Sequence, residues 1–93
     1  MQIPSKVKIG PIIYHVEEVN GLRDGDTKLD GHIRYSDCKI LIEEELDPMV
    51  KRVVFVHEFL HGILTQASIE HTESLIDVLA YGIVDVLDNG MIP

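Results

Sequence analysis

Three side chains that can bind a metal or move a proton occur within five residues, in the order His57, Glu58 and His61. On a helix, residues four apart lie one turn apart on the same face, so both imidazoles can reach one ion. Neutral imidazole nitrogen is a common ligand of Zn²⁺. Glu58 follows the first histidine by one position, which turns it about 100° around the helix axis. It would therefore stand off the metal but close to a water molecule that the metal polarises, where it can act as general base.

The surrounding sequence predicts that this motif lies in the middle of a buried helix. Asp47 can accept bonds from free N–H groups, and Pro48 is favoured at the first helical position, so a helix should begin here and run to about Gln66. Apolar residues surround its axis from about Val53 to Leu64, which indicates burial on most sides. Burying three ionisable groups without a partner is costly, and a metal supplies that partner. The alternative is a set of core histidines hydrogen-bonded to carboxylates.

A second helix is predicted from Thr72, a capping residue, to about Asp88, just before Asn89-Gly90. The connection over residues 67–71 is short, so the two helices should pack antiparallel. The apolar positions of this second helix form one stripe, the side that an amphipathic helix normally turns toward the core: Leu75, Val78, Leu79, Ile83, Val86 and Leu87.

A catalytic zinc site usually needs a third protein ligand and one open position for water. In an antiparallel helix pair, residues equidistant from the turn face each other, which places Asp77 level with His61 and favours it as that ligand. Glu73 is the alternative and takes the role if the first helix ends early. The two acids are one turn apart, so one of them could ligate while the other orients a histidine. Glu70 and His71 are further candidates, although His71 is more typical of a loop residue.

The first half of the chain has the short alternating patterns of β-strands. They are separated by turn residues, and residues 20–31 are expected to form a loop. The acidic run Glu43-Glu44-Glu45 is expected to be a solvated strand end. We therefore predict one α+β domain over residues 1–93, a small, mostly antiparallel sheet packed on two antiparallel helices. The strands are predicted at residues 6–9, 12–19, 32–35 and 39–43.

Composition argues against several classes of partner. The net charge is −8 and the eight basic residues are scattered, so nucleic acid is not expected to bind. No apolar run approaches the roughly 20 residues that cross a membrane. Cys38 is the only cysteine, and the residues after Met1 lack the apolar segment of a signal peptide, so we expect a cytoplasmic protein. The sequence does not determine the oligomeric state.

The motif and its context resemble known metallopeptidase families. HExxH followed by an acidic residue on the next helix looks like the gluzincin-type metallopeptidases, and Asp77-Val78-Leu79-Ala80 is similar to the acidic-x-x-Ala segment of the ImmA/IrrE-like metallopeptidases. In outline, the 93 residues resemble short HExxH proteins of phages and prophages. The resemblance implies a minimal zincin-like domain with one Zn²⁺ per chain, in the cytoplasm of a phage- or prophage-bearing bacterial host. Glutamate is commoner at the ligand position than aspartate, whose reach is shorter, and this keeps Glu73 open as the ligand.

The predicted function is zinc-dependent hydrolysis of a peptide or protein substrate, with Glu58 as the catalytic residue. Zincins often use a further His or Tyr to stabilise the oxyanion, and Tyr35, Tyr81 and His71 are candidates by chemistry. Core packing is the preferred interpretation of both tyrosines. The alternative function is a zinc-stabilised, phage-derived protein-binding module without turnover.

Overall fold

The computed structural model describes residues 1–90 of the chain. β1, β2, β6 and β5 form one sheet in that order, with β2 and β6 parallel and the other neighbours antiparallel. β3 and β4 form a separate two-stranded sheet. The predicted α+β class with a small, mostly antiparallel sheet is thus confirmed. In chain order the elements are β1 (Lys6–Ile9), β2 (Ile12–Val19), β3 (Arg23–Asp24), β4 (Thr27–Lys28), β5 (Gly31–Arg34), β6 (Lys39–Glu43), α1 (Pro48–Gln66) and α2 (Glu73–Asn89).

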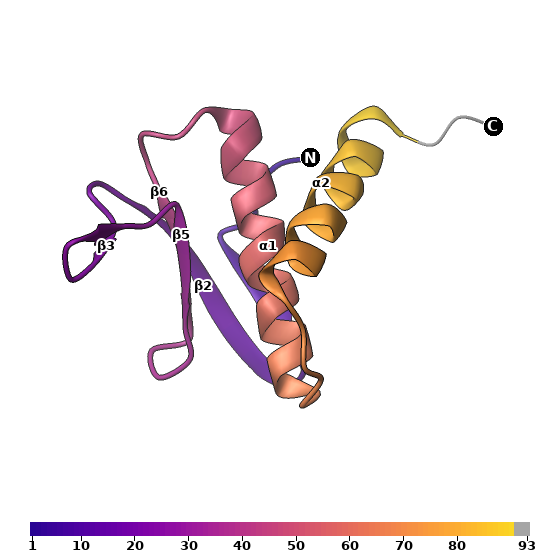
Figure 1. Cartoon of the computed structure of the whole chain (residues 1–93), viewed down its shortest axis with the longest axis horizontal. Coiled ribbons are helices and arrows are strands. Elements are labelled where there is room, and N and C mark those ends of the chain that lie inside the picture. Colours follow the sequence, from indigo (N-terminus) through magenta and orange to yellow (C-terminus); the bar gives the residue numbers. More distant parts are fainter. Residues whose placement is uncertain (91–93) are drawn as a thin grey trace.

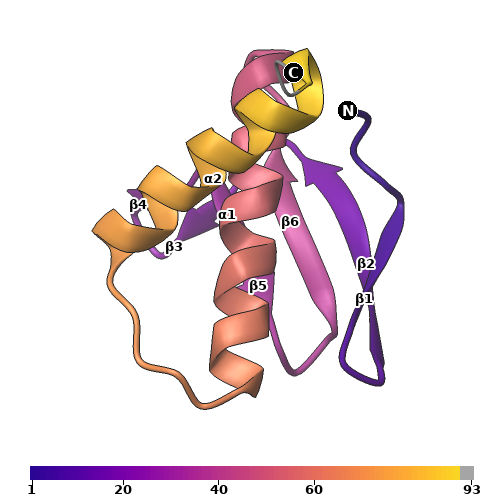
Figure 2. The ribbon, with the colours of Figure 1, turned by 90° about the vertical axis from the view of Figure 1, so that its right-hand side faces the viewer.

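The sheet and the two helices are arranged in three layers (Figure 1). α1 packs against β1, β5 and β6, and α2 packs on α1. Figure 2 shows α2 running back across α1 at an oblique angle. Within residues 1–90, the backbone of α2 comes close to α1 and to none of the strands, so the sheet is covered by one helix rather than two. No helix in this part of the chain is long and apolar enough to cross a membrane.

Local capping sets the starts of both helices. The Asp47 carboxylate accepts a hydrogen bond from the Met49 N–H at 2.9 Å, and α1 begins at the following proline. The Thr72 hydroxyl accepts from the Leu75 N–H at 3.2 Å and caps α2. These bonds satisfy N–H groups that have no partner inside the helix. The predicted helix boundaries are confirmed to within about one residue.

Two glycines let α1 lie close against the sheet. A Cβ on Gly31 would stand 2.3 Å from Cγ1 of Val54 and 3.3 Å from Cγ of Glu58, and one on Gly62 would stand 2.6 Å from Cδ1 of Ile9. No side chain could occupy either place without moving its neighbours. Gly31 begins β5, an edge strand of the sheet, so the edge runs directly beside the turn of α1 that carries Glu58.

The buried face of α2 differs from the predicted apolar stripe. The residues of α2 that are almost fully buried are Ile76, Ala80 and Val84, one every four positions. Each residue of the predicted stripe exposes at least 36% of its surface, and Val78 exposes 72%. The row that packs on α1 also carries Glu73 and Asp77, because residues 73, 76, 77, 80 and 84 share one side of a helix.

Glu43 is a buried carboxylate and not the solvated strand end that was predicted. Glu43 exposes only 6% of its surface. Its carboxylate accepts hydrogen bonds from the Leu22 N–H at 2.9 Å and the Glu45 N–H at 3.1 Å. Hydrogen bonds from these backbone N–H groups hold the pKa of Glu43 below its ordinary value, and the bond from Glu45 has the largest effect. The carboxylate thereby fixes the start of the segment over residues 22–29, which contains the β3–β4 hairpin where a loop was predicted.

Glu43→Gln is expected to lower the melting temperature at neutral pH by several degrees, because an amide oxygen is a weaker acceptor for the two N–H groups. A lowered folded-state pKa stabilises the fold above the unfolded value of about 4.5, and this contribution is lost as the pH falls through the folded pKa. The difference between wild type and variant should therefore shrink below about pH 4.5. Thermal unfolding followed by circular dichroism from pH 3 to pH 7 measures this difference in melting temperature. A constant difference across this range would contradict the assigned role.

Candidate metal centre

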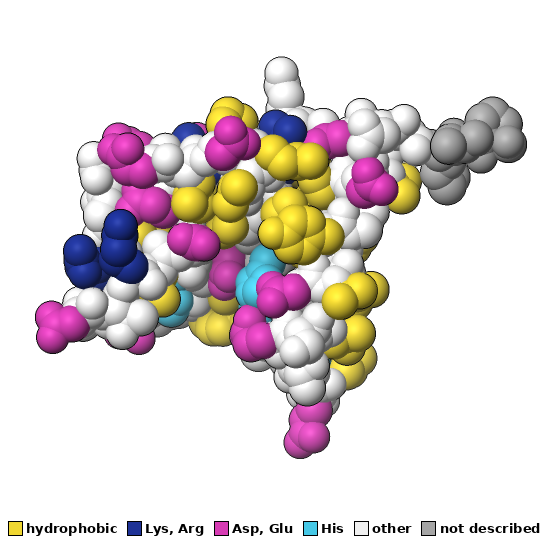
Figure 3. Space-filling model, turned by 45° about the horizontal axis from the view of Figure 1, so that its top comes forward, with side chains coloured by type: hydrophobic (Ala, Val, Ile, Leu, Met, Phe, Trp, Pro, Cys, Tyr) yellow, Lys and Arg dark blue, Asp and Glu magenta, His cyan; other side chains and the backbone are white. Residues whose placement is uncertain are grey.

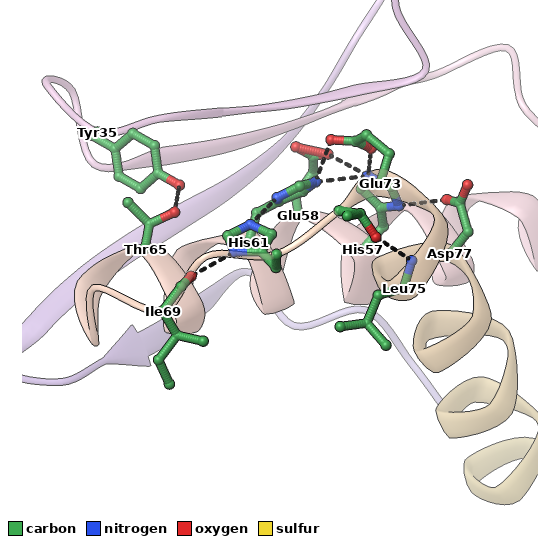
Figure 4. A network of polar contacts seen from close by, with 11 residues as sticks. Tyr35, His57, Glu58, His61, Thr65, Ile69, Glu73, Leu75 and Asp77 are labelled. Carbon is green, nitrogen blue, oxygen red and sulfur yellow. Dashed lines mark hydrogen bonds and ion pairs between the residues drawn. The ribbon is translucent and has the colours of Figure 1, made fainter.

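Three side chains from the two helices point at one another (Figure 4). His57 Nε2 lies 3.1 Å from His61 Nε2 and 3.0 Å from Glu73 Oε2, and His61 Nε2 lies 2.9 Å from Glu73 Oε1. Both histidines come from one face of α1, and Glu73 is the first residue of α2. Within residues 1–90, this is a group of three whose ligand atoms all lie within 4.8 Å of one another.

The spacing of these atoms fits a tetrahedral metal site. Two ligands that are each about 2.0–2.1 Å from a tetrahedral zinc lie about 3.4 Å apart. The three separations between His57, His61 and Glu73, 2.9–3.1 Å, are within about 0.5 Å of that value. Two imidazoles and one carboxylate also form a known donor set of catalytic zinc. The residues present therefore fit this metal in chemistry and in spacing.

A hydrogen-bond chain sets the proton on His61. Nδ1 of His71 lies 2.9 Å from the Ile69 carbonyl oxygen, which can only accept, so this Nδ1 carries a proton. In neutral His71 the other nitrogen, Nε2, is then an acceptor, and it lies 2.8 Å from Nδ1 of His61. The Nδ1 of His61 must therefore donate. Neutral His61 consequently presents an unprotonated Nε2, with a free lone pair, to the centre of the group.

Asp77 fixes His57 in the same way. Its Oδ1 lies 2.9 Å from Nδ1 of His57, on the side of the ring that faces away from His61. A carboxylate accepts, so Nδ1 donates and the neutral ring directs the lone pair of Nε2 at Glu73 and His61. With both rings in this neutral form, the two Nε2 lone pairs and the Glu73 carboxylate meet at 2.9–3.1 Å. A cation held between these atoms would relieve the repulsion of the lone pairs and the carboxylate.

The environment of His61 favours its neutral form, which is the form that binds metals. Burial lowers the pKa of His61, and the nearby His57 and His71 rings lower it further, while the Glu73 carboxylate acts in the opposite direction. Glu73 itself has 72% of its side-chain surface exposed. The cluster is thus closed on the side of α1 and open to solvent on the side of Glu73.

Glu58 lies beside this group and not in it. Its Oε2 is 3.9 Å from Nε2 of His57, and the residue is 9% exposed. Burial raises the pKa of the Glu58 carboxyl above its ordinary value, opposed by the neighbouring His57 and reinforced by the Glu73 carboxylate. A carboxylate with a raised pKa is a stronger base, so its position and basicity suit the acceptance of a proton from a nearby water.

The structure brings together His57, His61 and Glu58 as the motif spacing predicts. The third side chain that converges on the two histidine Nε2 atoms is Glu73 and not Asp77. Asp77, the favoured ligand in the sequence, instead holds the far nitrogen of His57. The position of His71 behind His61 was not predicted, because it depends on the path of residues 67–72.

The remaining candidates are not among the three residues whose ligand atoms converge. Glu70 is exposed and lies outside the group. Neither Tyr35 nor Tyr81 packs in the core: they are 45% and 63% exposed. The Tyr35 hydroxyl pairs with Thr65 at 3.2 Å, whereas Tyr81 lies beside His57 in the lining of a cavity.

This cavity, of about 280 Å³, adjoins the group on the side of Glu58. Its inner lining includes the buried residues Val53 and Glu58, and its outer lining includes the exposed Asp30, Asp77 and Tyr81. Figure 3 views the molecule from this side, where histidine and acidic side chains lie together between hydrophobic areas. The cavity therefore combines apolar walls with carboxylates near its opening.

Comparison with protein families, curated proteins and solved structures finds no match for this chain. The resemblance to zincin-like proteins thus stays a prediction, and the functional argument rests on the geometry of the site.

Proposed function

We propose that this chain is a zinc-dependent metallohydrolase acting on peptide bonds, with His57, His61 and Glu73 as ligands and Glu58 as general base. The observation that carries the proposal is the meeting of two imidazole Nε2 atoms and a carboxylate, 2.9–3.1 Å apart, beside a buried glutamate. Three protein ligands leave the fourth tetrahedral position open, as catalysis requires. A structural zinc site would close with four protein ligands and has no need of a base.

A zinc ion held here would polarise the scissile carbonyl group and make water more acidic. Glu58 takes the proton of the attacking water and returns it to the leaving amine. Its carboxylate lies next to the ligand His57, and burial raises its pKa and so makes it a stronger base. Asp77 and His71 hold the Nδ1 protons of the two histidines and keep both Nε2 atoms aimed at one point.

The edge of the sheet offers a place for an extended peptide. β5 is an edge strand, and a Cβ on its first residue, Gly31, would stand 3.3 Å from Cγ of Glu58 in α1. A peptide that adds to this edge as a further strand would pass beside the general base. One of its side chains would enter the adjoining cavity, where the apolar Val53 and the carboxylates of Asp30 and Asp77 fit an aliphatic stem with a positively charged end. We therefore expect lysine or arginine next to the cleaved bond.

Cleavage of a peptide library by the zinc-loaded protein tests this function. We expect cleavage that a chelator abolishes and added zinc restores, with lysine or arginine enriched at one position beside the cut. Asp30→Asn should reduce the preference for a positive residue a few-fold while neutral peptides are still cleaved, because exposed charges contribute little each. Asp26→Asn, an exposed residue outside the cavity lining, is the matched control. A zinc-loaded protein that cleaves no peptide would leave the zinc-stabilised binding module as the better assignment.

A further inference from the structure

A groove leads away from the metal centre along the junction of α1 and α2. Residues four positions apart lie on one face of a helix, and one such row from each helix lines the groove. At the end next to the metal centre, Asp77 contacts His57 at 2.9 Å (Figure 4). We name this feature the interhelical groove. Its α1 side is formed by Met49, Val53 and His57, and its α2 side by Asp77, Tyr81 and Asp85.

The interhelical groove joins two cavities. The first is the cavity beside Glu58 described above. The second has a volume of about 330 Å³ and contains neither the metal ligands nor Glu58 in its lining, so it lies farther from the reacting bond. Val53 and Tyr81 line both cavities, which makes the two direct neighbours. The lining of the second cavity consists of Met49, Val53, Tyr81, Gly82, Val84 and Asp85.

The second cavity has an apolar floor and an acidic edge. Val53 and Val84 are buried, whereas Met49 exposes 42% of its surface. A methionine at the rim of such a floor adapts to side chains of different shape. Asp85 is exposed at the edge. Within residues 1–90, neither cavity has a lysine or arginine in its lining. The interhelical groove therefore suits an uncharged aliphatic or aromatic side chain on a peptide of positive charge.

The distance between the two cavities determines which residue of a peptide would reach the second one. Met49 and Val53 precede His57 by eight and four positions, so the middle of this pair lies about 9 Å from His57 along the axis of α1. An extended peptide advances about 3.3 Å per residue, and every second side chain points the same way. If the first residue beside the cut occupies the first cavity, the third residue reaches the second cavity and points toward it.

We propose that the second cavity is a substrate subsite for an apolar side chain, at the third residue from the cut and on the same side as the basic first residue. This inference rests on the proposed function, because the occupant is the peptide substrate of that site. It narrows the substrate class to cationic peptides in which a lysine or arginine is followed, two positions farther from the cut, by a leucine, methionine or phenylalanine.

Selection from a random octapeptide library tests the subsite separately from cleavage. The full-length, zinc-loaded Glu58→Gln protein is immobilised, because this substitution removes the proposed base and keeps the three converging ligands. Bound peptides should contain lysine or arginine and, two residues away, an apolar residue enriched about tenfold over glycine, as partial burial of one such side chain provides. Sequencing of fragments cut by the wild type should place these residues first and third on one side of the cut.

Met49→Glu, tested by the same selection, should shift the preference at the third residue several-fold from leucine toward lysine, because it puts a carboxylate into the second cavity. Met49 lies in the first turn of α1, where an acidic residue is favourable, so the fold should be kept. Met49→Ala should reduce the enrichment of leucine without favouring lysine. Ile13→Glu is the matched control, since Ile13 is 50% exposed on β2 and lines neither cavity. It should preserve both preferences, and circular dichroism establishes that each variant is folded.

The outcomes separate the subsite from the proposed function. Both preferences in bound peptides without cleavage by the wild type would support the subsite and refute the hydrolase. Cleavage or binding that selects a basic residue alone, with no preference two residues away, would overturn the subsite and leave the hydrolase standing. An apolar preference that Met49→Glu changes no more than Ile13→Glu does would overturn its assignment to the interhelical groove. A library from which nothing is bound or cleaved would refute both.

Discussion

Glu58→Gln should reduce peptide hydrolysis by about 10²–10⁴-fold while the protein keeps its zinc. Glutamine has the size of glutamate and can still accept a hydrogen bond, but it cannot take a proton from water. The Glu58 carboxylate is 3.9 Å from Nε2 of His57 and is not one of the three converging ligands. The variant should therefore bind about one zinc per chain and unfold at a temperature close to that of the wild type.

The measurement pairs the rate on the best peptide with elemental analysis of zinc and a melting curve. Glu70→Gln is the matched control, since Glu70 is exposed and lies outside the ligand group. It should keep both zinc and activity. A Glu58→Gln protein that cleaves as fast as the wild type would exclude Glu58 as the base. A variant that loses zinc together with activity would show that this carboxylate supports the site and not the proton transfer.

Glu73→Ala should remove zinc almost completely, whereas Asp77→Ala should weaken zinc affinity by about 10–100-fold. Glu73 faces Nε2 of both histidines at 2.9–3.0 Å, so its loss takes away one of three protein ligands. Asp77 touches only Nδ1 of His57, where it fixes the tautomer and the orientation of the ring. The loss of such an outer partner costs about 10–100-fold in affinity.

Competitive titration with a chelator ranks these two variants against the wild type. Both side chains are mostly exposed, with 72% and 59% of their surfaces accessible, so neither substitution should unfold the protein. Glu70→Ala controls for the removal of an acidic side chain near the site. If Asp77→Ala proved the more damaging change, Asp77 would be the third ligand, as its place in the sequence favours. Equal and small effects would refute a zinc site in this group.

Local features of the sequence were sufficient for the elements and for part of the site. Asp47 and Thr72 predict the helix starts because capping depends on residues only two or three positions away. His57 and His61 share a face because they are four apart on one helix. The position of Glu58 beside them follows from the same geometry.

The third ligand depended on how the two helices cross. Counting residues from the turn assumes two parallel axes and a tight connection, and it places Asp77 opposite His61. In the structure α2 crosses α1 obliquely, and the non-helical segment over residues 67–72 precedes it. Glu73 thus reaches the histidines at the very start of α2, and His71 lies behind His61. These distances join residues 10 or more positions apart, so no local pattern contains them.

The orientation of α2 and the burial of Glu43 were likewise decided by tertiary structure. Periodicity shows that α2 has more than one row of apolar residues. The row that packs on α1 is the one on the same side of the helix as Glu73 and Asp77, which lie at the site. That row, Ile76, Ala80 and Val84, is narrow, and the larger apolar side chains are left outside. Glu43 is buried because its carboxylate finds backbone donors at Leu22, 21 positions earlier. By itself the sequence determined the helices, most of the strands and the paired histidines, because these follow from contacts within a few residues; the third ligand and the exposed face required the packing of segments distant in the chain.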